Sequence, residues 1–186
     1  MGDIYFDLHS SDDLAGMAPQ PMPGGGFTNA ALPPALHGPG LYIVYNHLTN
    51  NRYVGISNDL AERFGGRMSV ITELGFDHHT MSNILIWWGR AGVKNTGAMG
   101  NPNWLQNYSP PLVAPVDGVN INLEHLLIRY VLNGLGADGT VSNNIFASQP
   151  ITNNTGRTVE IYFRSCQNPV FAAYNHQLHW LAGHQI

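Results

Sequence analysis

The chain has 186 residues, 44% of them hydrophobic, which suits one folded domain with appendages. Only 11% of the residues are charged and the formal net charge is −4, which excludes binding of nucleic acid mainly through a broad basic face. The single cysteine, Cys166, excludes an internal disulfide bond and a cysteine-rich zinc site.

The sequence contains neither an apolar run of roughly 20 residues, the length of a membrane-spanning helix, nor the pattern of a secretory signal peptide. We therefore expect no membrane association and a cytoplasmic site of action. If the protein acts in another cell, we expect a dedicated secretion system to deliver it.

The start of the chain reads as a lead or linker. Prolines and glycines interrupt every periodic pattern before residue 38, so residues 1–37 are predicted to be largely irregular. Only Ile4, Tyr5 and Phe6 offer a short apolar stretch for docking. The folded domain is predicted over residues 38–186, with a C-terminal extension from about residue 147.

Two strands and a helix are predicted next. Leu41–Asn46 alternates β-branched and aromatic residues with period two, and Tyr53–Ile56 resumes that pattern after an Asn-rich turn at Thr49–Arg52. Ser57 is expected to cap the following helix, which carries Arg63 and is predicted to end near residues 65–66. The two tyrosines of the hairpin and this arginine are expected to face one concave surface.

Later segments supply another strand, a long loop and a second helix. The apolar run Asn83–Trp88 predicts a third strand buried on both faces, and residues 92–118 predict a long loop. Asn120–Asn133 predicts a helix with Glu124 on the same inward face as Leu127 and Ile128. A buried carboxylate must be paired or must bind a cation, and the helix alone favours neither.

The C-terminal part predicts additions to that core. Thr158–Phe163 has the alternation of a strand, and Val170–Ala182 has that of an amphipathic helix.

Two triplets and an arginine resemble one known family. Gly40-Leu41-Tyr42, Tyr53-Val54-Gly55 and Arg63 look like the core of the GIY-YIG endonucleases, with Leu and Val in the places of two isoleucines. The resemblance covers residues from about 38 to 146. It implies an α+β fold with a small three-stranded antiparallel sheet flanked by helices, and a metal-dependent endonuclease that uses Mg²⁺ or Mn²⁺ on nucleic acid, with double-stranded DNA as the expected partner.

The same resemblance implies the roles of the site residues. Glu124 would bind the metal ion and Arg63 would hold the scissile phosphate. Tyr42, supported by Tyr53, would orient or deprotonate the attacking water, although strand tyrosines also pack across hairpins for structural reasons alone. His47 is the nearest substitute for the basic residue that many members carry after the second triplet. Asn144, with Asn143 in reserve, matches an asparagine that follows the glutamate.

The biological setting stays open at this stage. An interbacterial toxin or effector domain, inhibited by an immunity protein, fits the low charge and the Pro/Gly-rich lead. A restriction or repair nuclease also fits. The rival from another class is a non-catalytic nucleic-acid-binding module of the same fold, favoured by the absence of a lysine after Gly55.

Overall fold

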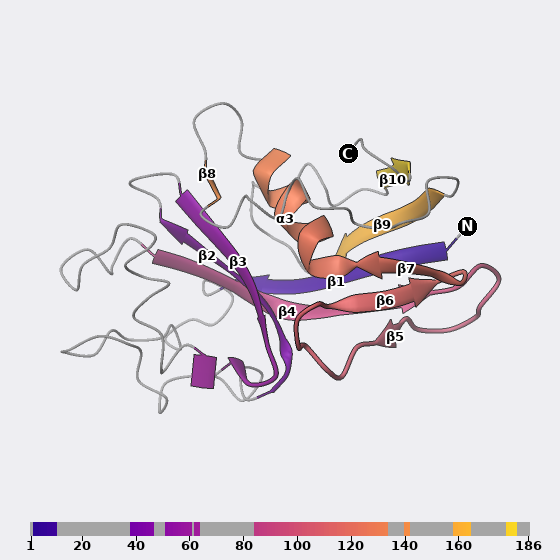
Figure 1. Cartoon of the computed structure of the whole chain (residues 1–186), viewed down its shortest axis with the longest axis horizontal. Helices are drawn as coiled ribbons and strands as arrows, with labels where there is room; N and C mark the ends of the chain where they lie inside the picture. The colour runs from indigo at the N-terminus through magenta and orange to yellow at the C-terminus, as the bar shows by residue number, and fades with distance from the viewer. Residues whose placement is uncertain are drawn as a thin grey trace.

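The computed structural model describes residues 2–10, 38–46, 51–60, 62–63, 84–133, 140–141, 158–164 and 178–181. Over these residues the fold is mixed α+β and mostly sheet, with one long helix (Figure 1). That helix is not of the length and apolarity that a membrane crossing requires, and the described residues contain no other candidate. In chain order the elements are β1 (Gly2–Ser10), β2 (Gly40–Asn46), β3 (Asn51–Ser57), β4 (Ile84–Lys94), β5 (Asn103–Trp104), β6 (Val113–Val116), β7 (Val119–Asn122), α3 (Leu123–Asn133), β8 (Thr140–Val141), β9 (Thr158–Arg164) and β10 (Leu178–Leu181).

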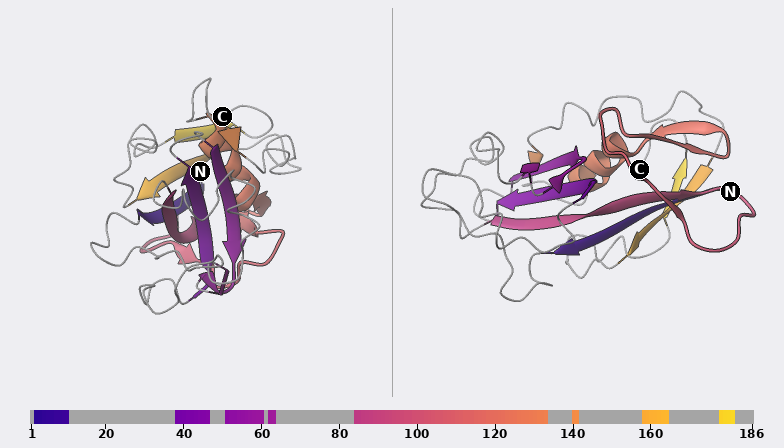
Figure 2. Two further views of the ribbon diagram at one scale, coloured as in Figure 1. Left: turned by 90° about the vertical axis from the view of Figure 1, so that its left-hand side faces the viewer. Right: turned by 90° about the horizontal axis from the view of Figure 1, so that it is seen from below.

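Strands from both ends of the described chain form one twisted sheet (Figure 2). Its order is β10-β9-β1-β4-β2-β3-β8, and β5 pairs with β4 beside this path. The β1–β9 and β3–β8 pairs are parallel, and the other pairs of the sheet are antiparallel. The long strand β4 pairs with both β1 and β2, so it connects the two halves of the sheet.

One face of this sheet carries the main core. Ile4, Phe6 and Leu8 alternate along β1 and are fully buried, and the residues that pair with them in β4 and β9 lie on the same face. Buried side chains of α3 and of the β6–β7 hairpin belong to the same apolar cluster. In Figure 1 this hairpin lies across β1 and β4, with α3 beside it. The helix and the hairpin therefore cover the core face of the sheet.

Several sequence predictions are confirmed. The hairpin strands form β2 and β3, and Thr158–Phe163 lies within β9. The predicted third strand is the first half of β4. Its neighbours Trp87 and Trp88 point to opposite faces of the sheet and are only 1% and 2% exposed, so this strand is buried on both faces.

The prediction of an irregular lead over residues 1–37 is wrong for Gly2–Ser10, which forms β1. This strand lies inside the sheet, between β9 and β4, and is not an appendage of the domain. Its partner strands are distant in sequence: Asp7, for example, pairs with Arg90 and with Arg164. The residues around β1 therefore do not indicate which strands it pairs with. The rest of the predicted lead lies outside the described residues.

Five other predictions need correction. The sheet has eight strands among the described residues where three were expected, because β1, β5, β8, β9 and β10 extend it. The predicted loop over residues 92–118 contains β5, β6 and the last residues of β4. Asn51 and Arg52, which were predicted to lie in the hairpin turn, belong to β3. Residues 120–122 are strand, so α3 begins only at Leu123. Leu178–Leu181, within the predicted terminal helix, is β10, because pairing with β9 satisfies its backbone.

Substitution of Phe6 tests the interior position of β1. The Phe6 ring is fully buried and stacks on Phe163, with ring centroids 5.3 Å apart. We expect Phe6→Ala to lower the free energy of unfolding by about 3–5 kcal/mol in urea denaturation, because it removes a large core side chain. Met99→Ala, at a side chain that is 96% exposed, is the control. A Phe6→Ala protein as stable as the Met99→Ala protein would contradict an interior β1.

Candidate functional site

The register of the β2–β3 hairpin places two tyrosines on one face of the sheet. Tyr42 lies directly opposite Gly55, and Tyr53 precedes that glycine by two residues on the same strand. The two tyrosine rings stack with centroids 6.1 Å apart and an angle of 25° between their planes. This face is opposite the core face, on which Ile43 and Val54 are buried.

Gly55 leaves the space that the Tyr42 ring occupies. A Cβ atom at position 55 would lie 2.5 Å from both Cζ and Oη of Tyr42, closer than real Cβ contacts come. Tyr42 is only 1% exposed, so its ring has little room to move. The glycine therefore fixes where the tyrosine hydroxyl lies.

A helical turn after β3 carries Arg63. The carboxylate of Asp59 accepts the Glu62 N–H at 3.0 Å, and the Asp59 carbonyl accepts the Arg63 N–H at 3.1 Å. Asp59 is thus the N-cap, in correction of the prediction that Ser57 caps this helix. Ser57 instead closes the turn before it, donating its hydroxyl to the Asp59 carbonyl at 2.7 Å.

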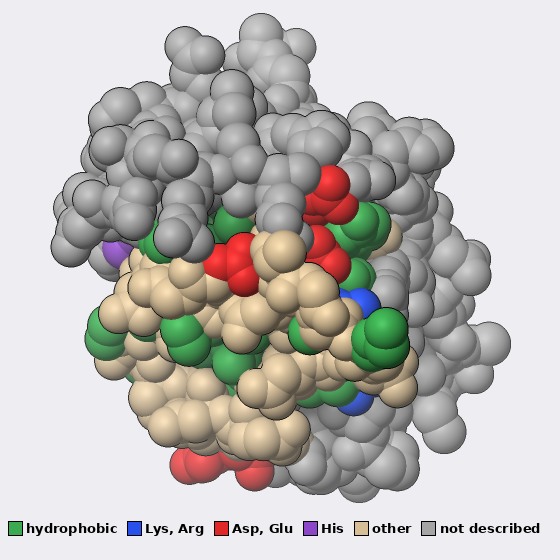
Figure 3. Space-filling model, turned by 90° about the vertical axis from the view of Figure 1, so that its right-hand side faces the viewer, with side chains coloured by type: hydrophobic (Ala, Val, Ile, Leu, Met, Phe, Trp, Pro, Cys, Tyr) green, Lys and Arg blue, Asp and Glu red, His purple; other side chains and the backbone are tan. Residues whose placement is uncertain are grey.

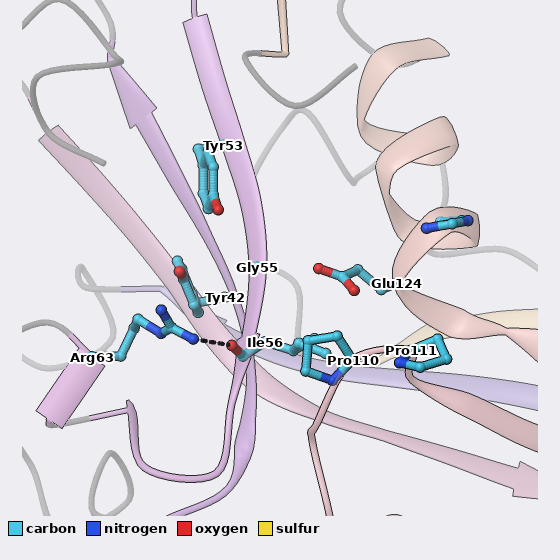
Figure 4. A pocket seen from close by; sticks show the side chains of 9 residues that line it. Tyr42, Tyr53, Gly55, Ile56, Arg63, Pro110, Pro111 and Glu124 are labelled. Carbon is cyan, nitrogen blue, oxygen red and sulfur yellow. Dashed lines mark hydrogen bonds between the residues drawn. The ribbon is translucent and has the colours of Figure 1, made fainter. Parts of the chain in front are cut away.

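The Arg63 side chain folds back toward β3. Its Nη2 atom donates to the carbonyl oxygen of Ile56 at 3.4 Å. In Figure 4, Arg63 and the two tyrosines lie on one side of β3, with Tyr42 between Tyr53 and Arg63. Because β8 pairs with β3 only at Asn51 and Arg52, β3 beyond them is an edge strand within the described part of the sheet.

Glu124 reaches the same edge from the first turn of α3. The Asn122 side chain accepts the His125 N–H at 3.1 Å, and this cap starts the helix immediately before Leu123. Leu127 is fully buried, as predicted, whereas Glu124 is half-buried. In Figure 4 the Glu124 carboxylate points from the helix toward β3 at Gly55.

These side chains line one pocket with a volume of about 500 Å³. We call it the candidate pocket (Figure 4). Its lining residues come from the hairpin, the helical turn, the loop before β6 and the start of α3: Tyr42, Tyr53, Gly55, Ile56, Arg63, Pro110, Pro111, Glu124 and His125.

Four of the residues singled out from the sequence therefore meet, and two lie outside the described residues. Tyr42, Tyr53, Arg63 and Glu124 all line the candidate pocket. His47 and Asn144, as well as the reserve Asn143, fall in parts of the chain that the structure does not describe.

Three lining residues were missed by the sequence analysis. Pro110 and Pro111 lie in the predicted long loop, where nothing in the sequence indicated which residues would approach the site. His125 directly follows Glu124, and its position next to the proposed metal ligand was the signal that could have found it.

The candidate pocket contains two opposite charges in different surroundings. Burial raises the pKa of the Glu124 carboxyl above its ordinary value, and the positive charge of Arg63 opposes this rise without cancelling it. The position of Glu124 in the first helical turn also favours its charged form, since the positive end of the helix dipole is there. A cation bound to the carboxylate would remove the cost of its burial.

The donor set fits one kind of metal ion better than another. Glu124 is the only carboxylate among the pocket-lining residues, and the described part of the chain contains no group of three His, Cys, Asp or Glu side chains that could hold a metal ion. A zinc site needs three or four protein ligands. Mg²⁺ retains several waters and is often held by one or two carboxylates together with substrate phosphate, so this pocket fits Mg²⁺ or Mn²⁺.

Replacement of Gly55 by Ala tests the contact with Tyr42. We expect Gly55→Ala to destabilise the protein by about 1–3 kcal/mol in urea denaturation, because the new methyl group overlaps a buried ring. The Tyr42→Ala background is the control, since there the ring is gone and the same glycine substitution should cost much less. Equal costs in the two backgrounds would show that the ring does not rest on Gly55.

The raised pKa of Glu124 predicts a pH-dependent gain in stability when its charge is removed. The folded-state pKa exceeds the ordinary value of 4.5, so ionisation is disfavoured in the folded state. The protein bears no such penalty below pH 4.5 and acquires it as the pH rises through the folded-state pKa. Measured with chelator present, the melting temperature of Glu124→Gln should match the wild type at low pH and exceed it near pH 7.

Glu62→Gln, on an exposed side chain of the neighbouring turn, is the matched control for removing a carboxylate. A Glu124→Gln protein that gains no more than this control at pH 7 would contradict the burial of the Glu124 carboxylate.

Comparison of the chain with models of known protein families, with curated proteins and with solved structures finds no match. The candidate site is therefore defined by the geometry of this chain itself. Two tyrosines of one hairpin, an arginine of the next helical turn and a glutamate of α3 line a single pocket at the edge of the sheet.

Proposed function

We propose that this chain is a metal-dependent endonuclease that hydrolyses phosphodiester bonds of nucleic acid, with double-stranded DNA as the expected substrate. The observation that carries the proposal is the pocket that gathers Tyr42, Tyr53, Arg63 and Glu124 from three separate segments. Phosphodiester hydrolysis needs a positive group on the phosphate, a proton acceptor for the water and a site for a cation. The resemblance to GIY-YIG endonucleases supports the proposal through the same four residues.

Arg63 is proposed to hold the scissile phosphate. Its guanidinium is planar and permanently charged, and it carries five N–H donors. The contact with the Ile56 carbonyl uses one of these donors and orients the group at the pocket wall. The remaining donors supply the capacity to bind phosphate oxygens and to stabilise negative charge as it develops on them.

The tyrosine pair is proposed to handle the attacking water. A tyrosine hydroxyl has an ordinary pKa near 10 and acts as a base near neutral pH only when positive charge lies close by. Arg63 provides such a charge in the same pocket, and in Figure 4 Tyr42 lies nearer to it than Tyr53 does. We therefore assign Tyr42 as the proton acceptor and Tyr53 as its stacking support.

Glu124 is proposed to hold the metal ion. When bound, Mg²⁺ or Mn²⁺ would neutralise negative charge on the phosphate. Glu124 is the only carboxylate among the pocket-lining residues and lies across the pocket from the tyrosines, so it is the residue that would hold the ion (Figure 4).

The net charge of this chain favours binding of nucleic acid through a few contacts inside the pocket over binding through a basic surface. The formal net charge is −4, and the described part of the face in Figure 3 shows acidic side chains with only small areas of Lys and Arg. Such a protein gains little from counterion release along the phosphate backbone. The contacts inside the pocket would therefore carry most of the affinity for the substrate.

Cleavage of plasmid DNA tests the proposal. With Mg²⁺ the wild-type protein should nick or linearise a supercoiled plasmid, and chelator should stop the reaction. Glu124→Gln and Arg63→Ala should each lower the rate by about 100-fold or more, the range seen when a group that stabilises the transition state is removed.

Two substitutions outside the pocket are the matched controls. Glu62→Gln removes a carboxylate from the neighbouring helical turn, and Arg90→Ala removes a half-exposed guanidinium from β4. Both variants should cut at nearly the wild-type rate. Cleavage that persists in Glu124→Gln and Arg63→Ala would refute this site, and DNA binding without cleavage under any divalent ion would favour the non-catalytic module.

A further inference from the structure

A hydrogen-bonded loop joins the two segments that carry opposite charges to the pocket. Asn58 follows β3 and precedes the turn that carries Arg63. Its Oδ1 atom accepts the N–H of Tyr108 at 2.7 Å, and its Nδ2 atom donates to Oγ of Ser109 at 2.8 Å. The side chain is exposed, yet both of its polar ends engage a segment 50 residues away. We call residues 107–112 the bridging loop.

The bridging loop is anchored to the body of the sheet. The Tyr108 ring is 1% exposed, and its hydroxyl accepts the Ala91 N–H at 2.7 Å and donates to the Ala91 carbonyl at 3.3 Å. Burial raises the pKa of Tyr108 to about 12, so this hydroxyl stays protonated across the physiological range. The anchor fixes the loop where it passes Asn58.

The other end of the loop reaches α3. Pro110 and Pro111 line the candidate pocket, and the next residue, Leu112, accepts the N–H of Leu123 at 2.8 Å. Leu123 is the first residue of the helix and immediately precedes Glu124. Short hydrogen bonds therefore connect the turn of Arg63, through the bridging loop, to the helix start that carries Glu124.

We propose that Asn58 is a positioning residue, which holds the turn of Arg63 and the start of α3 at a fixed separation through the bridging loop. The proposal rests on the hydrolytic function assigned above, because that separation matters only if both groups act on one phosphate. An exposed hydrogen bond contributes little to stability, whereas a small misplacement of catalytic groups has a large effect on rate.

Three variants separate positioning from simple stabilisation. Asn58→Ala removes both contacts, and we expect it to lower kcat at least 10-fold while KM changes less than about threefold. Asn58→Asp keeps the acceptor for Tyr108 and can accept the Ser109 hydroxyl, so it should restore most of the lost kcat. Asn95→Ala is the matched control: Asn95 also bridges two exposed segments, accepting the Asp117 N–H at 2.7 Å, and it is not a pocket residue.

Amide hydrogen exchange by NMR supplies a readout that needs no activity. In Asn58→Ala, the Tyr108 amide loses its acceptor, and the Leu123 amide should exchange faster as well if the bridging loop holds α3. In Asn58→Asp and Asn95→Ala, the exchange of Leu123 should remain as in the wild type.

The outcomes distinguish this inference from the proposed function. An inactive wild-type protein would refute the function, and the exchange of Leu123 alone would then decide whether the loop holds the helix. If the wild type cuts DNA and Asn58→Ala keeps the kcat of Asn95→Ala, the positioning role is wrong while the function stands. Faster exchange at Tyr108 alone, with Leu123 unchanged, would also overturn it.

Discussion

In the β2–β3 pair, the ring of Tyr42 fills the space that any side chain at position 55 would need. This contact depends on the register that places the two residues opposite each other, and the same register puts Tyr53 on that face. A slip of β3 by one residue would place Val54 or Ile56 opposite Tyr42 and turn Tyr53 toward the core face, so the two tyrosines would no longer share a face. The candidate site thus depends on Gly55, which leaves room for the Tyr42 ring, and on the β2–β3 register, which the packing of that ring helps to fix.

The apolar core and the candidate site lie on opposite faces of the sheet. Large apolar side chains of β1, β4 and β9 pack with α3 on one face of the sheet, while the tyrosines lie on the other face. The pocket lies where β3 is an edge strand within the described part of the sheet, and there a side chain from α3 approaches residues of the opposite face. A site at such an edge receives groups from both layers of the domain without opening its core.

The electrostatics of the pocket leave the burial of the Glu124 carboxylate only partly compensated by other protein groups. A half-buried carboxylate with a raised pKa costs stability in its charged form, and the nearby arginine offsets only part of that cost. A titratable group that is shifted by burial and lies in a pocket beside an opposite charge is a candidate for a functional group. The bridging loop adds a mechanical link, because its backbone is hydrogen-bonded to the Asn58 side chain, which precedes the turn of Arg63, and to the N–H of Leu123, which precedes Glu124.

The sequence by itself determined the local elements and the chemistry-bearing residues near them. Period-two alternation identified β2, β3 and β9, and the apolar stripe of α3 placed Glu124 beside Leu127. These signals are local, since each arises from residues that are neighbours along the chain. The approach of Tyr42, Tyr53 and Arg63 to one concave surface was expected from these local elements, whereas the approach of Glu124 to the same site was expected only from the resemblance.

Only the tertiary structure decided which distant segments meet. β1 was mistaken for part of a linker because its pairing with β4 and β9 is encoded far along the chain. Likewise, nothing near Pro110 or Asn58 indicates that one lines the pocket and the other holds that loop. The physical reason is the same in both cases. Backbone N–H and C=O groups must find hydrogen-bond partners, and in strand pairing and loop anchoring these partners lie far away in the sequence, so the neighbouring residues do not indicate them.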